Sequence, residues 1–247
     1  MKSSKFLKGL LFIVILSSSL SGATHFWRAT DKNGIEVVLE GELIQSSTEG
    51  IYEKLNVCAS FYAEASEEMH RSALKKYPLL VLLPPVWPML FKKGFKSWRQ
   101  VLQDDFEQEI TKILTPKENE EYYLFSVKDL EGEMLGFFLG YKGPTSIACR
   151  IHPYNPNEIE VFHFMISSKA RGRGLSKILL PTILKLLPDT KRIFFGTSKS
   201  NKVVIAGCSA FKGFKISDES CFGVEFECLV DSCVAQIQEA TDQLISL

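Results

Sequence analysis

The chain has 247 residues, of which 45% are hydrophobic and 23% are charged, so it is long enough to bury one good core. Lysine plus arginine and aspartate plus glutamate are equal in number, at 29 each, so no overall positive field exists to hold a polyanion. This balance argues against nucleic-acid binding through a broad basic face, and we expect no nucleic-acid partner.

The N-terminus has the layout of a secretory signal peptide. Lysines precede the apolar run 9–16, and small residues follow, with Ser21 and Ala23 at the spacing that a signal peptidase accepts. The stretch 9–23 is shorter than the roughly 20 apolar residues of a spanning helix. We therefore expect residues 1–23 to be a signal peptide of an exported, periplasmic or secreted protein with no stable membrane span after cleavage. An uncleaved anchor and a cytosolic protein remain the alternatives.

The first half of the chain predicts two strands and two helices. The stretch "HFWRATDKNGIEVVLEGELI" reads as two strands about a turn in which Asn33 and Gly34 supply positive φ. Apolar residues recur at helical spacing after the cap Thr48 and again over 95–113. Four prolines between residues 78 and 88 predict a short strand or buried loop there.

The second half of the chain predicts strands that first pair with one another and then alternate with helices. The stretches "EYYLFSVKD" and "MLGFFLGYKG" form a hairpin, and "NEIEVFHFMIS" forms a third long strand. A helix over about 174–187, a strand "RIFFGTS", a helix over about 201–211 and a last strand "CFGVEFECLV" follow. Pro181 should kink the first of these helices. We expect a mixed α/β (α+β) fold, with helices packed on the sheet.

The six cysteines and four histidines suggest no metal site. No CxxC motif occurs, and the histidines are scattered along the chain. Cys208 falls on a predicted helix, and Cys228 alternates with apolar residues on a strand face. We expect buried thiols here, not a disulfide framework.

The stretch "SSKARGRGLSKILL" connects a predicted buried strand to an apolar helix. The first N–H groups of a helix lack internal partners, and the helix dipole is positive at that end, so the start of such a helix can bind an anion. Gly172 and Gly174 let a ligand approach the backbone. On these residues alone, a phosphate site and a solvated basic turn are both open, while GxGxxG and GK[ST] phosphate motifs are not completed.

The order of elements around this loop resembles the GNAT superfamily of acyl-CoA-dependent N-acetyltransferases. That family has a strand entering [Q/R]xxGx[G/A] at a helix start, and here the segment reads Lys169, Ala170, Arg171, Gly172, Arg173, Gly174. The downstream "RIFFGTSKSN" and "AFKGF" and the upstream hairpin are also similar, over roughly residues 95–230. The resemblance implies a mostly antiparallel central sheet flanked by helices, with an N-terminal extension. It divides the chain into 1–23, an N-terminal strand and helix portion 24–94, and an acyltransferase domain 95–247.

The resemblance implies acetyl-CoA as acyl donor and no metal. Loop amides would receive the pyrophosphate, the edge of the preceding strand would bind the pantetheine arm, and Asn201 would reach that arm from the next helix. The implied contacts are Phe164, Met165, Ile166, Lys169, Arg171, Gly172, Arg173, Gly174, Leu175, Ser176 and Asn201. The cationic side chains would make additional contacts to phosphate, with Arg173 facing solvent.

The resemblance also suggests catalytic residues. Glu160 matches the position of a catalytic glutamate and would be the general base for the attacking amine; a half-exposed strand carboxylate is the alternative. His163 should project from the opposite face to Glu160, as a packed core or edge histidine. Many members carry a tyrosine as acid to the leaving thiolate, and that place falls here at Ser209, a poor proton donor.

The expected activity is therefore acetyl or acyl transfer to a primary amine, on a small molecule or on a protein lysine or N-terminus. A catalytically silent member that binds coenzyme A or a partner is the alternative. Acetyl-CoA is cytosolic, so export would suit a secreted bacterial effector that works in a host cytosol. The amine site is expected near residues 48–66 and 93–115, and neither the acceptor nor the oligomeric state follows from the sequence.

Overall fold

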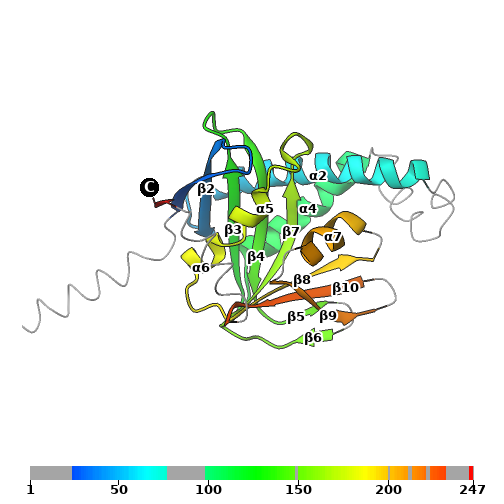
Figure 1. The fold of residues 1–247 in the computed structure, drawn as a ribbon. Helices are drawn as coiled ribbons and strands as arrows, with labels where there is room; N and C mark the ends of the chain where they lie inside the picture. The colour runs from blue at the N-terminus through cyan, green and yellow to red at the C-terminus, as the bar shows by residue number, and fades with distance from the viewer. Residues whose placement is uncertain are drawn as a thin grey trace, which may run out of the picture.

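The computed structural model describes residues 24–76, 98–147, 150–199, 201–210, 213–220, 223–231 and 245–246 (Figure 1). The strands are β1 (His25–Thr30), β2 (Glu36–Leu43), β3 (Glu121–Lys128), β4 (Met134–Lys142), β5 (Thr145–Ile147), β6 (Arg150–His152), β7 (Glu158–Ile166), β8 (Arg192–Ser198), β9 (Lys215–Glu219), β10 (Gly223–Leu229) and β11 (Ile245–Ser246). The helices are α2 (Ile51–Lys76), α4 (Trp98–Leu114), α5 (Leu175–Leu179), α6 (Thr182–Leu186), α7 (Lys202–Ala210) and the 3-10 helix η2 (Ser168–Ala170). The predicted signal peptide and the proline-rich stretch lie outside the described residues.

One nine-stranded sheet organises the fold, in the order β11-β1-β2-β3-β4-β7-β8-β10-β9. Neighbouring strands are antiparallel except β7 and β8, which run parallel. This mostly antiparallel sheet confirms the predicted fold class. Because β2 pairs with β3, the first hairpin continues the same sheet. The predicted domain boundary at 94/95 lies among residues that the structure does not describe.

The β1–β2 turn forms where the sequence predicts it, but of the two residues expected to have positive φ only Gly34 does, and the prediction for Asn33 is wrong. The side chain of Asp31 accepts hydrogen bonds from the backbone N–H groups of Asn33 and Ile35, at 2.8 and 2.9 Å. Gly34 has a φ of 80°, which only glycine adopts without strain. These local bonds set the register in which Thr30 faces Glu36.

Helices cover both faces of the sheet, because successive strand residues point to opposite sides (Figure 1). On β4, Phe137 packs in a cluster with α2 and α4, whereas the next residue, Phe138, packs in a second cluster with α5 and α6. Phe106 of α4 is among the largest fully buried side chains. The two helical layers therefore leave the strand ends of β7 and β8 for the functional site.

The helix predicted over 174–187 is interrupted, as expected from its proline. α5 ends at Leu179 and α6 begins at Thr182, with Pro181 at the N-cap of α6. Proline lacks the N–H that a continuous helix needs at this position. The interruption lies after the glycine loop in the chain, so it does not involve the backbone of Gly172 and Gly174.

Three cysteines are described, and none of them forms a disulfide with another. Burial raises the pKa of Cys58 to about 12 and that of Cys208 to about 11, so both thiols stay protonated at neutral pH. Within the described ranges no group of three or more His, Cys, Asp or Glu side chains could hold a metal ion. The described helices also include none long and apolar enough to cross a membrane.

Candidate active site

The loop between β7 and α5 has the backbone of an anion-binding turn. Gly172 and Gly174 have φ values of 81° and 78°, in the left-handed region that favours glycine. Among the described residues, no protein acceptor bonds the backbone N–H groups of Gly172, Gly174, Leu175 and Ser176. A cluster of N–H groups without protein partners attracts a negatively charged group. Leu175 is buried in the core and anchors this loop.

Arg173 contacts Asp31 of the β1–β2 turn, whereas it was predicted to face solvent. Its Nε donates to Oδ2 of Asp31 at 2.5 Å, and its carbonyl accepts from the N–H of Lys32 at 2.9 Å. Burial alone would raise the pKa of Asp31, but hydrogen bonds from Ile35, Arg173 and Asn33 hold it below its ordinary value. The Arg173 side chain is only 16% exposed, so the prediction that it faces solvent is wrong. Its guanidinium joins the loop to the β1–β2 turn.

The other loop cations lie at the surface. The side chains of Lys169, Arg171 and Lys177 are exposed, and Lys169 forms an ion pair with Glu133 at 3.3 Å. Exposed pairs of this kind contribute little to stability. These cations are therefore positioned to meet an anion that arrives from solvent.

The strands β7 and β8 separate after a short parallel pairing. Glu158, Ile159 and Glu160 pair with residues 192–194, and no pair follows, although β7 continues to Ile166 and β8 to Ser198 (Figure 1). The β8-facing edge of β7 therefore offers main-chain donors and acceptors just before the glycine loop. Phe164, Met165 and Ile166, which were predicted to bind the pantetheine arm, lie on this segment and are partly buried.

A pocket of about 190 Å³ lies beside the same strand. Its walls come from α4, β3, β4 and β7, and they are Glu109, Lys112, Ile113, Tyr122, Tyr141, Glu160 and Phe162. The rings of Tyr122 and Tyr141 lie 4.8 Å apart, and Phe162 lies edge-on to Tyr122 at 6.2 Å. The early helix α4 thus contributes to this pocket, in the region where the amine site was expected.

Glu160 lies in this pocket with an altered acidity. Burial raises its pKa, the Thr145 hydroxyl lowers it by donating a hydrogen bond, Glu225 raises it and His163 lowers it. The net effect is an increase, which brings the carboxylate closer to the range of an effective general base at neutral pH. The sequence identified Glu160 but not Thr145, since a threonine beginning a three-residue strand has no motif to mark it.

His163 lies on the same side of the sheet as Glu160, so the prediction of opposite faces is wrong. Phe137 pairs with Met165 and Leu139 with Phe162, so two residues of β7 oppose one of β4. This is a β-bulge, and His163 within it has a φ of 47°. The extra residue shifts the side-chain alternation, which a sequence pattern cannot reveal.

The bulge brings His163 against the two long helices. Its ring packs against Tyr62 and Phe106 at 4.8 and 5.0 Å, and its Nε2 lies 2.5 Å from Oε2 of Glu109. Glu109 also lines the pocket with Glu160. Its one sequence signal was its place three residues after Phe106, beside the apolar stripe of α4.

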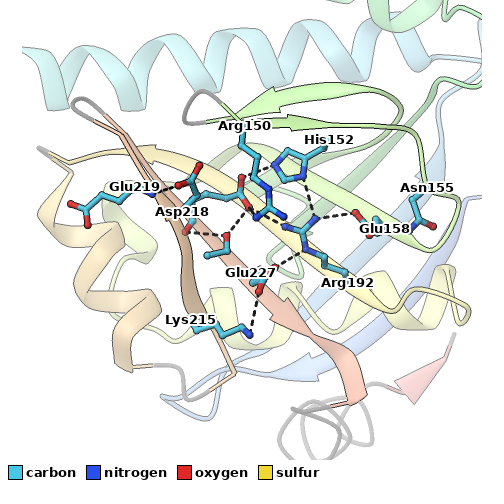
Figure 2. Close-up of polar contacts among 11 residues, drawn as sticks. Arg150, His152, Asn155, Glu158, Arg192, Lys215, Asp218, Glu219 and Glu227 are labelled. Atoms are coloured by element: carbon cyan, nitrogen blue, oxygen red, sulfur yellow. Dashed lines mark hydrogen bonds and ion pairs between the residues drawn. The ribbon is translucent and has the colours of Figure 1, made fainter.

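A buried polar cluster joins β6, β7, β8, β9 and β10 (Figure 2), and the charge of its Glu225 raises the pKa of Glu160. The fully buried carboxylate of Glu225 contacts His152 at 2.6 Å, Arg192 at 3.0 Å and Ser217 at 2.6 Å. Arg150 approaches it at 4.0 Å. A buried carboxylate needs such partners, because leaving it unpaired is costly.

Arg192 extends this cluster to neighbouring strands. It contacts Glu158 at 3.0 Å and Glu227 at 2.8 Å (Figure 2). Its guanidinium lies 4.4 Å from the ring centre of Phe194. His152 stacks on the same ring at 4.8 Å. The cluster thus binds β6 to the large sheet.

One end of the β5–β6 hairpin is held through both of its strands, because Thr145 of β5 pairs with His152 of β6. His152 is anchored through Glu225, while the Thr145 hydroxyl bonds Glu160. At the other end of β5, Ile147 packs so closely on Gly196 that a Cβ on Gly196 would lie 2.5 Å from Cγ2 of Ile147. The hairpin therefore sets where the Thr145 hydroxyl lies.

Two remaining predicted residues lie on α7. Asn201 caps this helix, because its Oδ1 accepts the N–H of Val204 at 3.3 Å and its Nδ2 contacts Thr197 at 3.3 Å. Ser209 belongs to α7, but its side chain is outside the described part of the structure. Asn201 is thus placed at the start of the helix that follows β8.

Comparison with known proteins agrees with this architecture. The acetyltransferase (GNAT) family matches residues 85–207, which include α4, β7, the glycine loop and β8. No curated protein sequence matches the chain. An uncharacterized protein from Bacillus halodurans shares the fold, with a TM-score of 0.52, 13% identity and coverage of 90% of this chain and 97% of that one.

Two further solved structures are similar at lower scores. FdhC, described as a nucleotide-linked sugar GNAT, has a TM-score of 0.47 and 11% identity, covering 87% of this chain and 95% of its own. Spermidine N-acetyltransferase from Vibrio cholerae, solved with CoA and spermine, has a TM-score of 0.36 and 13% identity, covering 57% and 80%. Through its domain at residues 85–207, the chain belongs to the acetyltransferase (GNAT) family.

Proposed function

We propose that the protein is an N-acetyltransferase that moves an acetyl group from acetyl-CoA to a primary amine. The observation that carries the proposal is the arrangement along β7. One strand presents Glu160 in a pocket and then an unpaired edge, and a glycine loop follows in which the N–H groups of Gly172, Gly174, Leu175 and Ser176 have no acceptor among the described residues. A base, a thioester site and an anion site follow one another in the order that the reaction needs.

The glycine loop would bind the donor's pyrophosphate. The N–H groups of Gly172, Gly174, Leu175 and Ser176 supply neutral donors, and the exposed side chains of Lys169 and Arg171 add positive charge. The backbone of Arg173 belongs to the same turn, while its side chain fixes the turn to Asp31. Acetyl-CoA is a substrate in this scheme, and no metal is required.

The unpaired edge of β7 would bind the pantetheine arm through Phe164, Met165 and Ile166. A main-chain N–H in this segment can donate to the thioester carbonyl and stabilise the negative charge that develops there. Asn201 caps α7 beyond the end of β8 and would contact the arm from that side. The two strands thus hold the donor between them.

Glu160 would remove the proton from the attacking ammonium, directly or through water. An aliphatic amine has a pKa of about 10 and is mostly protonated at neutral pH, so a base is needed. The amine nitrogen then forms a bond to the acetyl carbon as the carbon–sulfur bond breaks, and the sulfur leaves with the electron pair. The acylated nitrogen loses its remaining extra proton to the thiolate, which gives the amide and free coenzyme A. Ser209 stands where many members of the family carry a tyrosine that protonates the leaving thiolate. Serine is a poor proton donor, so the thiolate departs without a strong acid.

A Glu160→Gln variant tests the proposal. We expect wild-type protein to bind acetyl-CoA and to acetylate a mixture of primary amines, detected by mass spectrometry. The variant should bind acetyl-CoA equally well but transfer acetyl roughly a hundredfold or more slowly, because only the base is lost. The poor acid at Ser209 favours a second candidate, a CoA-binding protein without activity, and binding without turnover by the wild type would select it.

We also propose that the chain is exported and that residues 1–23 are removed. The charged start, the apolar run and the small residues before residue 24 support this proposal. N-terminal sequencing of protein from its native cell is expected to begin near Thr24. A product beginning at Met1 would remove the export proposal.

A further inference from the structure

The pocket beside Glu160 carries more negative than positive charge. Among the residues that the structure describes, two carboxylates, Glu109 and Glu160, and one cation, the exposed Lys112, line it. Tyr122 is affected by the same charges, since burial and then Glu120, Glu109 and Glu160 raise its pKa to about 12. A pocket with this charge favours cationic ligands and disfavours anionic ones.

The apolar part of the pocket is aromatic. Tyr122 and Tyr141 lie with ring centres 4.8 Å apart, and Phe162 meets Tyr122 edge-on. Aromatic faces attract ammonium groups electrostatically, and they also pack well against short methylene chains. The rings and carboxylates together suit an aliphatic chain that ends in a cation.

The second carboxylate is held in a fixed place. Glu109 bonds Nε2 of His163 at 2.5 Å, and the His163 ring is packed between Tyr62 and Phe106. His163 and Glu160 belong to the same strand, so Glu109 is tied to the element that carries the base. The two carboxylates are thus two separate fixed points around one pocket.

The pocket is also small. Its volume of about 190 Å³ is below the roughly 300–1,000 Å³ of pockets that enclose drug-sized ligands. It suits a chain of a few carbons. A small acceptor with a cation at each end uses both carboxylates.

We infer that the acceptor is a small aliphatic diamine, with the reacting amine at Glu160 and the second ammonium bound by Glu109 and the tyrosine rings. This inference rests on the proposed acetyl transfer. The proton that Glu160 removes comes from the reacting end alone. The other end keeps its charge and is released with the monoacetylated product.

Three probes with four-carbon chains test this inference. 1,4-Diaminobutane, n-butylamine and 4-aminobutanoate all carry a primary amine at one end of the chain, and at the other end they carry a second primary amine, no further group and a carboxylate, respectively. With full-length protein and acetyl-CoA, kcat/KM should be highest for the diamine. It should be roughly ten- to a hundredfold lower for the monoamine, which lacks one charge-assisted contact, and lowest for the amino acid.

A Glu109→Gln variant locates the second ammonium. Its preference for diamine over monoamine should fall toward one, because the contact to the second ammonium is lost. Glu107→Gln is the matched control, because Glu107 is an exposed acid on the same helix and does not line the pocket. Its preference should equal that of the wild type.

The outcomes separate the inference from the proposed function. Acetylation of n-butylamine or 4-aminobutanoate at a rate equal to or above that of the diamine overturns the inference and leaves acetyl transfer intact. An unchanged preference in the Glu109→Gln variant also overturns it. Failure of the wild type to bind acetyl-CoA overturns the proposed function itself.

Discussion

The hydrogen bond between Thr145 and Glu160 gives a sharp prediction about pH dependence. Replacing Thr145 by valine keeps the shape of the side chain but removes the hydroxyl that donates to the carboxylate. That bond favours the charged form and lowers the pKa of Glu160, against the larger effect of burial, which raises it. Its removal should therefore raise the pKa of Glu160 further. As the pH falls, the carboxylate that acts as base should then become protonated at a higher pH than in the wild type.

The size of the effect follows from the strength of such bonds. A hydrogen bond to a charged group contributes about 1.5–3 kcal/mol, and the lower end applies here because Glu160 is partly exposed. Since about 1.4 kcal/mol corresponds to a tenfold change in an equilibrium constant, kcat/KM on the acidic limb should fall roughly tenfold relative to the wild type.

The assay is kcat/KM for acetyl transfer measured from pH 5 to 9. Activity requires the carboxylate form, so it falls as the pH drops through the pKa of Glu160. Ser146→Ala is the control, since Ser146 is the exposed neighbour on the same strand, and its profile should match the wild type. An acidic limb that stays in place or moves to lower pH in the Thr145→Val variant would refute the assigned role of this bond.

Three further predictions concern stability, measured as the free energy of unfolding in urea. Asp31→Asn leaves the partly buried Arg173 without its buried counter-charge and should cost about 3 kcal/mol at pH 7. Because the pKa of Asp31 is lowered by folding, its contribution is lost as pH falls through the folded value, so variant and wild type should converge in acid; a pH-independent gap would contradict this. Glu225→Gln should cost about 2 kcal/mol by removing a charged partner of Arg192, and a neutral effect would show that the cluster does not stabilise the fold. Gly136→Ala should cost about 1–3 kcal/mol, because its Cβ would lie 2.8 Å from a backbone oxygen of β7, and unchanged stability would contradict the close packing.

Much of the sheet could be predicted because its strands have clear patterns and clear turns. The pair Asn33 and Gly34 between two strand patterns predicts a tight hairpin turn. Pro181 predicts an interruption in the helix that contains it. The glycine loop was recognisable since Gly172 and Gly174 are needed for its left-handed backbone. Glu160 was identified through its place on the strand before this loop.

Other parts depend on contacts distant in sequence. The strands β5 and β6 have three residues each, too few for alternation to be visible, and the hairpin is held by His152 bonding Glu225, 73 residues away. The face of His163 depends on a bulge that no residue type announces. Arg173 was expected in solvent because its partner Asp31 is 142 residues distant.

Acetyl-CoA binding to the full chain, measured by isothermal titration calorimetry, tests the central claim most directly. The wild type should bind one acetyl-CoA per chain. Arg171→Glu should weaken binding at least tenfold by placing a negative charge in the glycine loop. Lys185→Glu, an equally exposed charge reversal on α6, should leave binding unchanged. Absence of binding to the wild type, or equal binding by the wild type and Arg171→Glu, would contradict the assignment of this loop as the phosphate site.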